Sequence, residues 1–299
     1  MDVSHPTPAP SPVGKGFGVR SIGDLVRPGS YQLHSRFSHA VNYLDGNTLI
    51  AIVDETVGAG PVNIVADDLA DWGFGDLEIG TDDIDANGRD RPFRDVPRYD
   101  SSLRIPENPE PAPFRANLST LRDHLISIAP GDSLAFLLDG SPVDRREHTF
   151  DNALRSRFRA AVESWGNGRA IDGIGLIKGL GRGLTPQGDD FIAGLLFALH
   201  LRGGLFGEHV KGQIQAIGEA AQSNNPFSKA MLDCAARGRP FERLKNLINS
   251  LFEVDVVNIE ARTDELTAIG ATSGADLAVG FVLGLEQIIE PQRRGERKE

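Results

Sequence analysis

The residues with the clearest chemical potential lie at positions 181–190, which read GRGLTPQGDD. A glycine-rich turn that opens a helix exposes backbone N–H groups at the positive end of the helix dipole, and this favours an anion. The adjacent carboxylates would repel a bare phosphate, so they indicate a bound cation such as Mg2+ or a ligand with N–H groups. We predict Asp189 and Asp190 as catalytic acids. The predicted ligand contacts in this turn are Gly183, Thr185, Pro186 and Gly188.

A second turn near the C-terminus has a related sequence. Positions 270–276 read GATSGAD, and they match positions 183–190 when the second turn is allowed to be one residue shorter. Small residues follow four positions apart in each case, Gly194 and Ala198 in one and Gly280 and Gly284 in the other, so the two helices can approach closely. If they pack in parallel, both turns face one cavity. The predicted ligand contacts in the second turn are Thr272, Ser273, Gly274 and Asp276.

A structural role explains part of this pattern. One aspartate in each turn is accounted for as a helix cap or first-turn acid, which stabilises a helix by about 0.5–2 kcal/mol. The first turn has a second, adjacent aspartate that no cap requires. This extra acid, either Asp189 or Asp190, is the strongest candidate for a functional carboxylate.

The composition limits the class of protein. The formal net charge is −11, from 42 acidic and 31 basic residues, whereas a protein that binds duplex nucleic acid presents a basic face. The one cysteine cannot form an internal disulfide. No apolar run reaches the ~18 residues of a membrane span, and positions 1–15, with four prolines, form a flexible tail rather than a signal peptide. We expect a cytoplasmic protein that binds neither nucleic acid nor membranes.

The elements that must position the turns form an α+β fold. Residues 16–149 show short strand patterns, with strands expected at 43–53, 62–65, 77–79 and 134–138, a loop at 108–113 and one helix at 118–128 packed against the sheet. They predict an antiparallel, barrel-like β-rich domain. Residues 150–290 have a helical period and predict a helical domain that carries both turns, before a charged tail at 291–299. Its helices are expected at 151–165, 170–179, 189–202, 207–222, 227–237, 240–252, 257–269 and 275–289.

Three segments carry a resemblance to a known family. Positions 179–194, 225–228 (NPFS) and 272–276 resemble a bacterial family, long of unknown function, that includes the third subunit of oxamate carbamoyltransferase from anaerobic allantoin degradation. Positions 34–37 and 60–61 resemble it more weakly. Gln187 stands where serine is common in the family, and Ala271 where a polar residue is frequent.

The resemblance implies an activity and a set of partners. The reaction would be carbamoyl transfer between oxamate, oxalurate, phosphate and carbamoyl phosphate, in an enzyme with sister subunits and a small-molecule substrate. It also implies that Asn225 and Ser228 contact the ligand, although a helix N-cap is the simpler interpretation of both residues.

Two other functions fit the same residues. The chain could be a non-catalytic subunit that binds a metabolite or serves as a scaffold, or a helical enzyme similar to ADP-ribosyl hydrolases, with clustered aspartates and Mg2+. Positions 83–90 (DIDANGRD) also match the first half of a calcium loop, but Arg94 stands where a bidentate glutamate is required. Asn87-Gly88 is equally a hairpin turn.

Overall fold

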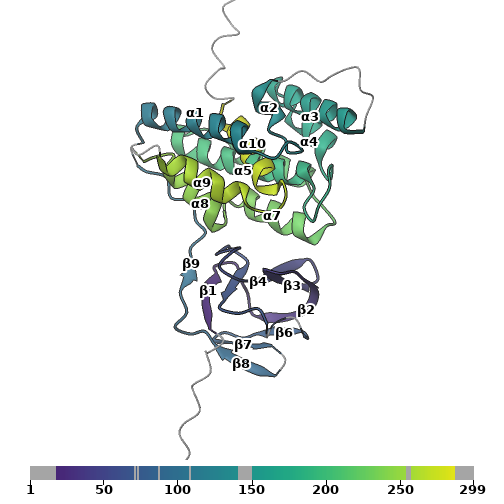
Figure 1. Ribbon diagram of the computed structural model, residues 1–299, viewed down its shortest axis with the longest axis vertical. Coiled ribbons are helices and arrows are strands. Elements are labelled where there is room, and N and C mark those ends of the chain that lie inside the picture. The colour runs from purple at the N-terminus through teal and green to yellow at the C-terminus, as the bar shows by residue number, and fades with distance from the viewer. Residues whose placement is uncertain are drawn as a thin grey trace, which may run out of the picture.

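The structure is a computed structural model that describes residues 18–286, except 71, 73, 87, 108, 141–149 and 254–256. The tails predicted at 1–15 and 291–299 lie outside the described residues. Strands near the N-terminus form one curled sheet, and helices follow it as a separate layer (Figure 1). This confirms the predicted α+β class with the strands first.

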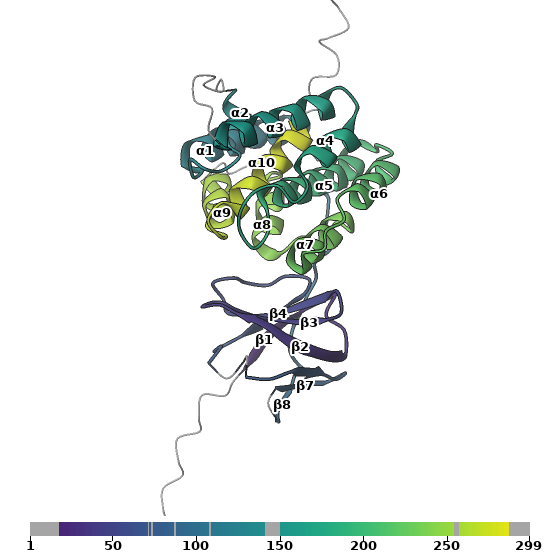
Figure 2. The same ribbon diagram turned by 90° about the vertical axis from the view of Figure 1, so that its right-hand side faces the viewer.

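The sheet has nine strands in the described residues, and it curls into a half-barrel (Figure 2). Its spatial order is β8-β7-β6-β2-β3-β4-β5-β1-β9. Most neighbours are antiparallel, as predicted, but β4 pairs with β5 and β1 with β9 in parallel. The strands are β1 (Val19–Gly23), β2 (Gly29–Arg36), β3 (Ala40–Asp45), β4 (Thr48–Val53), β5 (Asn63–Ala66), β6 (Leu77–Ile79), β7 (Asp83–Ala86), β8 (Arg89–Pro92) and β9 (Arg98–Tyr99).

Two hairpins follow the turn chemistry of the sequence. Asp45 pairs with Thr48, and Gly46 between them has φ +54°, a conformation that glycine adopts without strain. β7 and β8 form the second hairpin, in which Ala86 pairs with Arg89, Gly88 has φ +71° and the Gly88 N–H donates to Asp85 Oδ1 at 2.8 Å.

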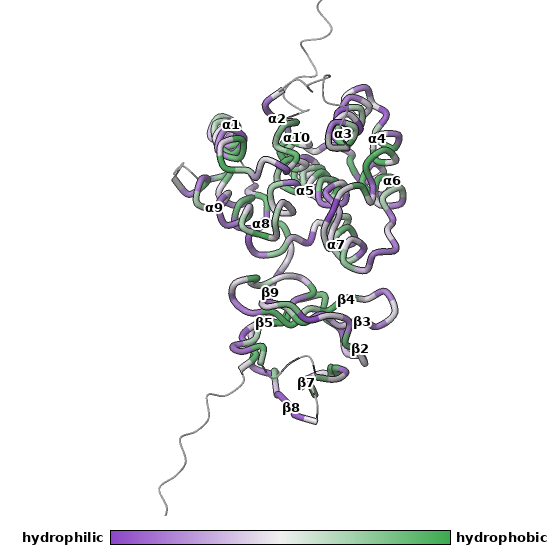
Figure 3. Tube along the Cα trace, turned by 45° about the vertical axis from the view of Figure 1, so that its right-hand side comes forward, coloured by the Kyte–Doolittle hydropathy of each residue, from purple (hydrophilic) through white to green (hydrophobic). Residues whose placement is uncertain are grey.

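Ten helices follow the sheet in the described part of the chain. They are α1 (Pro111–Ile128), α2 (Phe136–Asp139), α3 (Phe150–Gly166), α4 (Ala170–Ile177), α5 (Gln187–Phe206), α6 (Lys211–Ala220), α7 (Pro226–Ala236), α8 (Glu242–Ser250), α9 (Val257–Thr267) and α10 (Ser273–Glu286). α5 and α10 lie at the centre, and their apolar residues run through the middle of the layer (Figure 3). Every residue of α5 from Gln187 to Leu199 is buried, as expected for a helix that is apolar nearly all round.

The structure corrects three expectations near the middle of the chain. Residues 134–138 lead into the short helix α2 rather than a strand, since an apolar run of this length has no period that separates the two. α1 begins at Pro111, inside the expected loop, because proline lacks only an N–H that the first helical turn leaves unpaired. α1 also packs on α9 and α10 instead of on the sheet. The last strand therefore ends at Tyr99 and the first helix begins at Pro111.

Polar contacts join the sheet to the helices. Ala59 and Glu242 exchange two hydrogen bonds, since Ala59 N–H donates to Glu242 Oε2 at 3.0 Å and Glu242 N–H donates to Ala59 O at 2.9 Å. Tyr99 Oη donates to Pro240 O at 3.0 Å. The loop between β4 and β5 is thus fixed to the N-terminus of α8. No described helix combines the length and the apolar character that crossing a membrane would require.

Candidate functional site

The site is built on the contact between α5 and α10. A Cβ added to Gly194 would lie 2.0 Å from Leu277 O, and one added to Gly280 would lie 2.1 Å from Phe191 O. Contacts move toward the C-terminus on both helices together, because Gly284 meets Ala198. The helices are therefore parallel, and glycine allows their backbones to touch. Both N-termini lie at the same end of the pair.

The two contacts are equivalent to each other. Gly194 and Gly280 hold matching places in the repeated sequence, and so do Phe191 and Leu277. Each glycine meets the carbonyl of the other helix's matching residue. The two halves of the repeat are thus related by a pseudo-two-fold axis that runs along the helix pair.

The glycines that begin the two helices also match. A Cβ on Gly188 would lie 1.8 Å from Ile177 O, and one on Gly274 would lie 1.9 Å from Leu266 O. Each turn therefore folds back on the helix before it, α4 or α9. Gly188 and Gly274, both predicted to contact a ligand, are instead packed against protein backbone. Pro186 is the N-cap of α5, and its carbonyl accepts from the N–H groups of Asp189 and Asp190.

Asp190 and Asp276 are held reciprocally across the helix pair. Asp190 accepts hydrogen bonds from Thr185 of its own turn and from Ser273, the first residue of the other helix. Asp276 accepts from Thr272 of its own turn and from Gln187, the first residue of α5. It also accepts from the N–H of Leu134 at 2.7 Å. The two hydroxyl oxygens of Thr185 and Ser273 lie 3.3 Å apart.

Burial changes the protonation of both acids. It raises the pKa of Asp190 to about 8, with smaller contributions from the charges of Asp276 and Asp189, so Asp190 is mostly neutral at pH 7. Burial likewise raises the pKa of Asp276 to about 6. The Oδ2 atom of each carboxyl group has no hydrogen-bond partner among the described residues.

Asp189 has a different environment from Asp190. Its Oδ1 accepts a hydrogen bond from the N–H of Gly179 at 2.7 Å, and this bond ties the start of α5 to the beginning of the glycine-rich turn. Both side chains are only 1% exposed. The structure thus brings the predicted acids to one place but sets them behind the hydroxyl groups of the turns.

A cleft lies between the sheet and the helices, and we call it the sheet cleft. Its volume is about 570 Å3, and Thr185 and Ser273 lie in its wall. Most of the remaining wall is apolar, including Pro61 and Phe227. Its other charged and polar residues are His39, Thr56, Asn63, Arg239 and Arg243.

A second cavity lies on the other side of the paired turns, against α3, and we call it the α3 cavity. Its volume is about 530 Å3. Two predicted contacts, Gly183 and Thr272, line it together with Gln187. Four of the predicted ligand contacts are therefore divided between the two cavities, and the other six line neither of them: Pro186, Gly188, Asn225, Ser228, Gly274 and Asp276.

The ligand contacts predicted at the start of α7 are Asn225 and Ser228, and the hydrogen bonds of the Asn225 side chain go to backbone groups. Asn225 Oδ1 caps α7 by accepting from Phe227 N at 2.9 Å and Ser228 N at 3.3 Å. Its Nδ2 donates to Leu184 O at 2.7 Å and ties α7 to the first turn. Ser228 is fully buried, and its Oγ has no partner among the described residues.

The sequence prediction missed the residues that the sheet and α8 supply to the cleft. His39, Asn63 and Arg243 are far from the turns along the chain, and no spacing rule links them. Arg239 is paired with Asp24 at 3.2 Å, and Arg243 donates to Glu265 O at 2.9 Å. The Asp24 carboxylate partly offsets the charge of Arg239, whereas Arg243 keeps its charge because its partner is a neutral carbonyl group.

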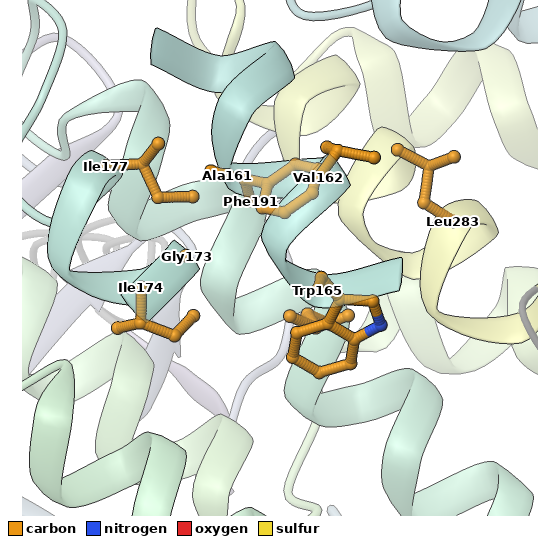
Figure 4. A pocket seen from close by; sticks show the side chains of 9 residues that line it. Ala161, Val162, Trp165, Gly173, Ile174, Ile177, Phe191 and Leu283 are labelled. Atoms are coloured by element: carbon orange, nitrogen blue, oxygen red, sulfur yellow. The ribbon is translucent and has the colours of Figure 1, made fainter. Parts of the chain in front are cut away.

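A third, much smaller cavity lies behind the helix pair. Its volume is about 10 Å3, at the lower limit for one water molecule, and apolar side chains line it (Figure 4). Trp165 and Phe191 are among its lining residues. It is a packing void between α3, α4 and α5 rather than a ligand site.

Comparison with known proteins bears on the turns. No curated protein and no solved structure is significantly similar to the chain. Residues 177–285 match the model of a family described as "Oxamate carbamoyltransferase subunit AllH". The matched segment runs from the end of α4 into the last turn of α10, so it contains both turns and the helix pair. Over this segment, which is less than half of the chain, the protein is similar to that family of transferase subunits.

Proposed function

We propose that this chain is a subunit of a carbamoyltransferase and that the sheet cleft holds its small-molecule substrate. The observation that carries the proposal is that the cleft gathers segments that are far apart in sequence. Gly60 and Pro61 come from the β4–β5 loop, Thr185 from the first turn, Phe227 from the start of α7 and Ser273 from the start of α10. All of these segments contribute to the family resemblance.

The chemistry of the wall suits a carbamoyl group next to an anionic group. The Thr185 and Ser273 hydroxyls donate their protons to Asp190, which fixes their positions, and their remaining lone pairs can accept the N–H groups of a carbamoyl ligand. Because burial raises the pKa of Asp190 to about 8, this acid adds little negative charge near pH 7. Arg239 and Arg243 supply positive charge elsewhere in the same wall.

The reaction would join two small molecules held side by side. The amide nitrogen of oxamate attacks the carbonyl carbon of carbamoyl phosphate, the new C–N bond forms, and the C–O bond to phosphate breaks. The nitrogen loses a proton and phosphate gains one, so oxalurate and inorganic phosphate result. The contribution of the chain is to orient the reactants and to stabilise charge in a site with little water. We assign Asp190 to positioning, since it touches the cleft only through Thr185 and Ser273.

The arrangement does not fit a magnesium site. Among the described residues, no group of three histidine, cysteine, aspartate or glutamate side chains could hold a metal. Asp190 and Asp276 already accept hydroxyl, amide or backbone hydrogen bonds. No step is therefore assigned to Mg2+.

A binding role without turnover is the second candidate. It is favoured because Asp189 and Asp190 are both buried, so no carboxylate of the helix pair is open to the sheet cleft. In that case a sister subunit would supply the groups that move protons, and this chain would hold one reactant.

Calorimetric titration with carbamoyl phosphate and with oxamate tests the proposal. We expect the purified chain to bind at least one of them, and Thr185→Val combined with Ser273→Ala to weaken binding by about tenfold or more. Thr120→Val on α1, far from the cleft, is the matched control and should bind normally. Turnover with and without sister subunits then separates the two candidates. Normal binding by the double variant would refute the sheet cleft as the site.

A further inference from the structure

The α3 cavity is the counterpart of the sheet cleft across the pseudo-two-fold axis. The sheet cleft takes Thr185 from the first turn and Ser273 from the start of α10. The α3 cavity takes Thr272 from the second turn and Gln187 from the start of α5. Gly270 on one side corresponds to Gly183 on the other. Each cavity thus has the same inner wall, made from one threonine and the first residue of the opposite helix.

The outer wall of the α3 cavity carries two arginines, Arg155 and Arg182. In the α3 cavity, Arg155 of α3 lies with its guanidinium carbon 4.4 Å from the centre of the Phe136 ring and donates to Gly131 O at 3.1 Å. These contacts fix its side chain and leave other N–H groups of the guanidinium for a ligand. Asp132 is the one acid in the wall.

Arg182 is the second cation of this wall. Its side chain makes no hydrogen bond or ion pair with another described residue, and it is exposed. It stands between Gly181 and Gly183, whose φ angles are +118° and +107°. The backbone N–H groups of residues 181–183, which line this cavity, likewise have no partner in the described part of the chain. Donors and positive charge therefore meet along one edge of a cavity of about 530 Å3.

A buried polar group without a full set of partners lies behind the residues that line the cavity. Asp276 is fully buried, and its Oδ2 has no hydrogen-bond partner among the described residues. The three groups that hold this carboxyl group, Leu134, Thr272 and Gln187, all line the cavity. Thr272 and Gln187 are thereby held in place at its surface, as Thr185 and Ser273 are in the sheet cleft.

We propose that the α3 cavity is a second binding site, specific for a small oxyanion, in which Arg155, Arg182 and the N–H groups of the glycine-rich turn bind the negative oxygens. Arginine is suited to this task because its planar guanidinium group binds carboxylate or phosphate oxygens in pairs. The site is separate from the sheet cleft and does not depend on carbamoyl transfer by this chain.

Titration of the full-length chain with inorganic phosphate and with oxalate tests this site at constant ionic strength. The two probes distinguish a phosphate site from a carboxylate site, and binding of either supports the proposal. We expect Arg182→Gln to raise the dissociation constant about tenfold. Arg155→Gln should have a similar effect, but its ring contact makes Arg182→Gln the cleaner variant. Arg157→Gln on the exposed face of α3 removes the same charge outside the cavity and should change the constant less than about twofold.

Three results would overturn the assignment. The first is that neither probe binds to the wild-type chain. The second is that Arg157→Gln weakens binding as much as Arg182→Gln, which would indicate a general charge effect. The third is that Ser273→Ala weakens binding while Arg182→Gln does not, which would place the anion in the sheet cleft. Ser273→Ala also separates the two proposals, since it should impair the sheet cleft and leave oxyanion binding in the α3 cavity intact.

Discussion

Replacing Asp190 with asparagine should change how the stability of the protein depends on pH. The pKa of this carboxyl group is about 8 in the folded chain against an ordinary value of 3.8, chiefly because the group is buried. Between these values the folded state holds a proton that the unfolded state has released. Stability falls with rising pH wherever the folded state binds more protons. Asp190 therefore makes the wild-type protein less stable as the pH rises from about 4 to about 8.

The size of the effect follows from the same two values. One pKa unit corresponds to about 1.36 kcal/mol, so the full interval from 3.8 to about 8 gives an upper limit of roughly 6 kcal/mol. Asp276, whose pKa is raised to about 6, adds a decrease of the same sign between about pH 4 and 6. Asparagine has nearly the same shape and no proton to lose, so Asp190→Asn removes the larger part of the decrease. The variant should gain stability relative to wild type, by several kcal/mol, between pH 5 and pH 8.

Urea unfolding followed by circular dichroism at pH 5, 6, 7 and 8 measures this difference. Asp123→Asn on the exposed face of α1 is the matched control and should leave the pH dependence unchanged. The explanation fails if Asp190→Asn has the same pH dependence as the wild type. It also fails if the variant loses stability relative to wild type as the pH rises, because Asp190 would then be stabilising as an anion.

The remaining predictions concern packing, capping and the one cysteine. Gly280→Ala should destabilise the protein by about 3 kcal/mol or more in thermal unfolding, because the added Cβ would lie 2.1 Å from Phe191 O. Gly175→Ala in α4 is the control: no atom lies within 4 Å of the added Cβ, so this variant should be more stable by about 0.5–1 kcal/mol. Asn225→Ala should cost about 1–2 kcal/mol through the lost cap of α7, and equal stability of the alanine variant would contradict the cap. Cys234 lines the sheet cleft, and burial raises its pKa to about 12, so a thiol reagent at pH 7.5 should react far more slowly than with a free thiol. Fast labelling of the folded chain would show that this wall of the cleft is open.

The paired helices could be predicted because glycine spacing has a direct geometric meaning. Gly194 and Gly280 had to mark a close approach, since no other residue lets two backbones touch. The turn at Asp45-Gly46 and the burial of α5 were predictable for equally local reasons. Each of these inferences needs only a few residues close together in the chain.

The rest depends on contacts that the sequence does not encode locally. The environment of Asp190 depends on the hydroxyl group of Ser273, which is far away along the chain, and the division of the ligand contacts depends on where α3 and the sheet pack. Residues 134–138 were misread because their apolar run suits a strand and a buried helix equally. α1 was placed on the wrong layer because its apolar face, including Phe114 and Leu121, matches any apolar surface, and tertiary packing chose α9 and α10.

Because the turn and its helix occur twice, each mutation in one half of the repeat has an internal control at the matching position of the other half. A change at Gly194 can be compared with the same change at Gly280 in an otherwise identical molecule, and likewise for Asp190 and Asp276. When two such variants behave alike, the effect belongs to the shared helix pair. When they differ, the cause lies in what surrounds each half, the β-sheet on one side and α3 on the other.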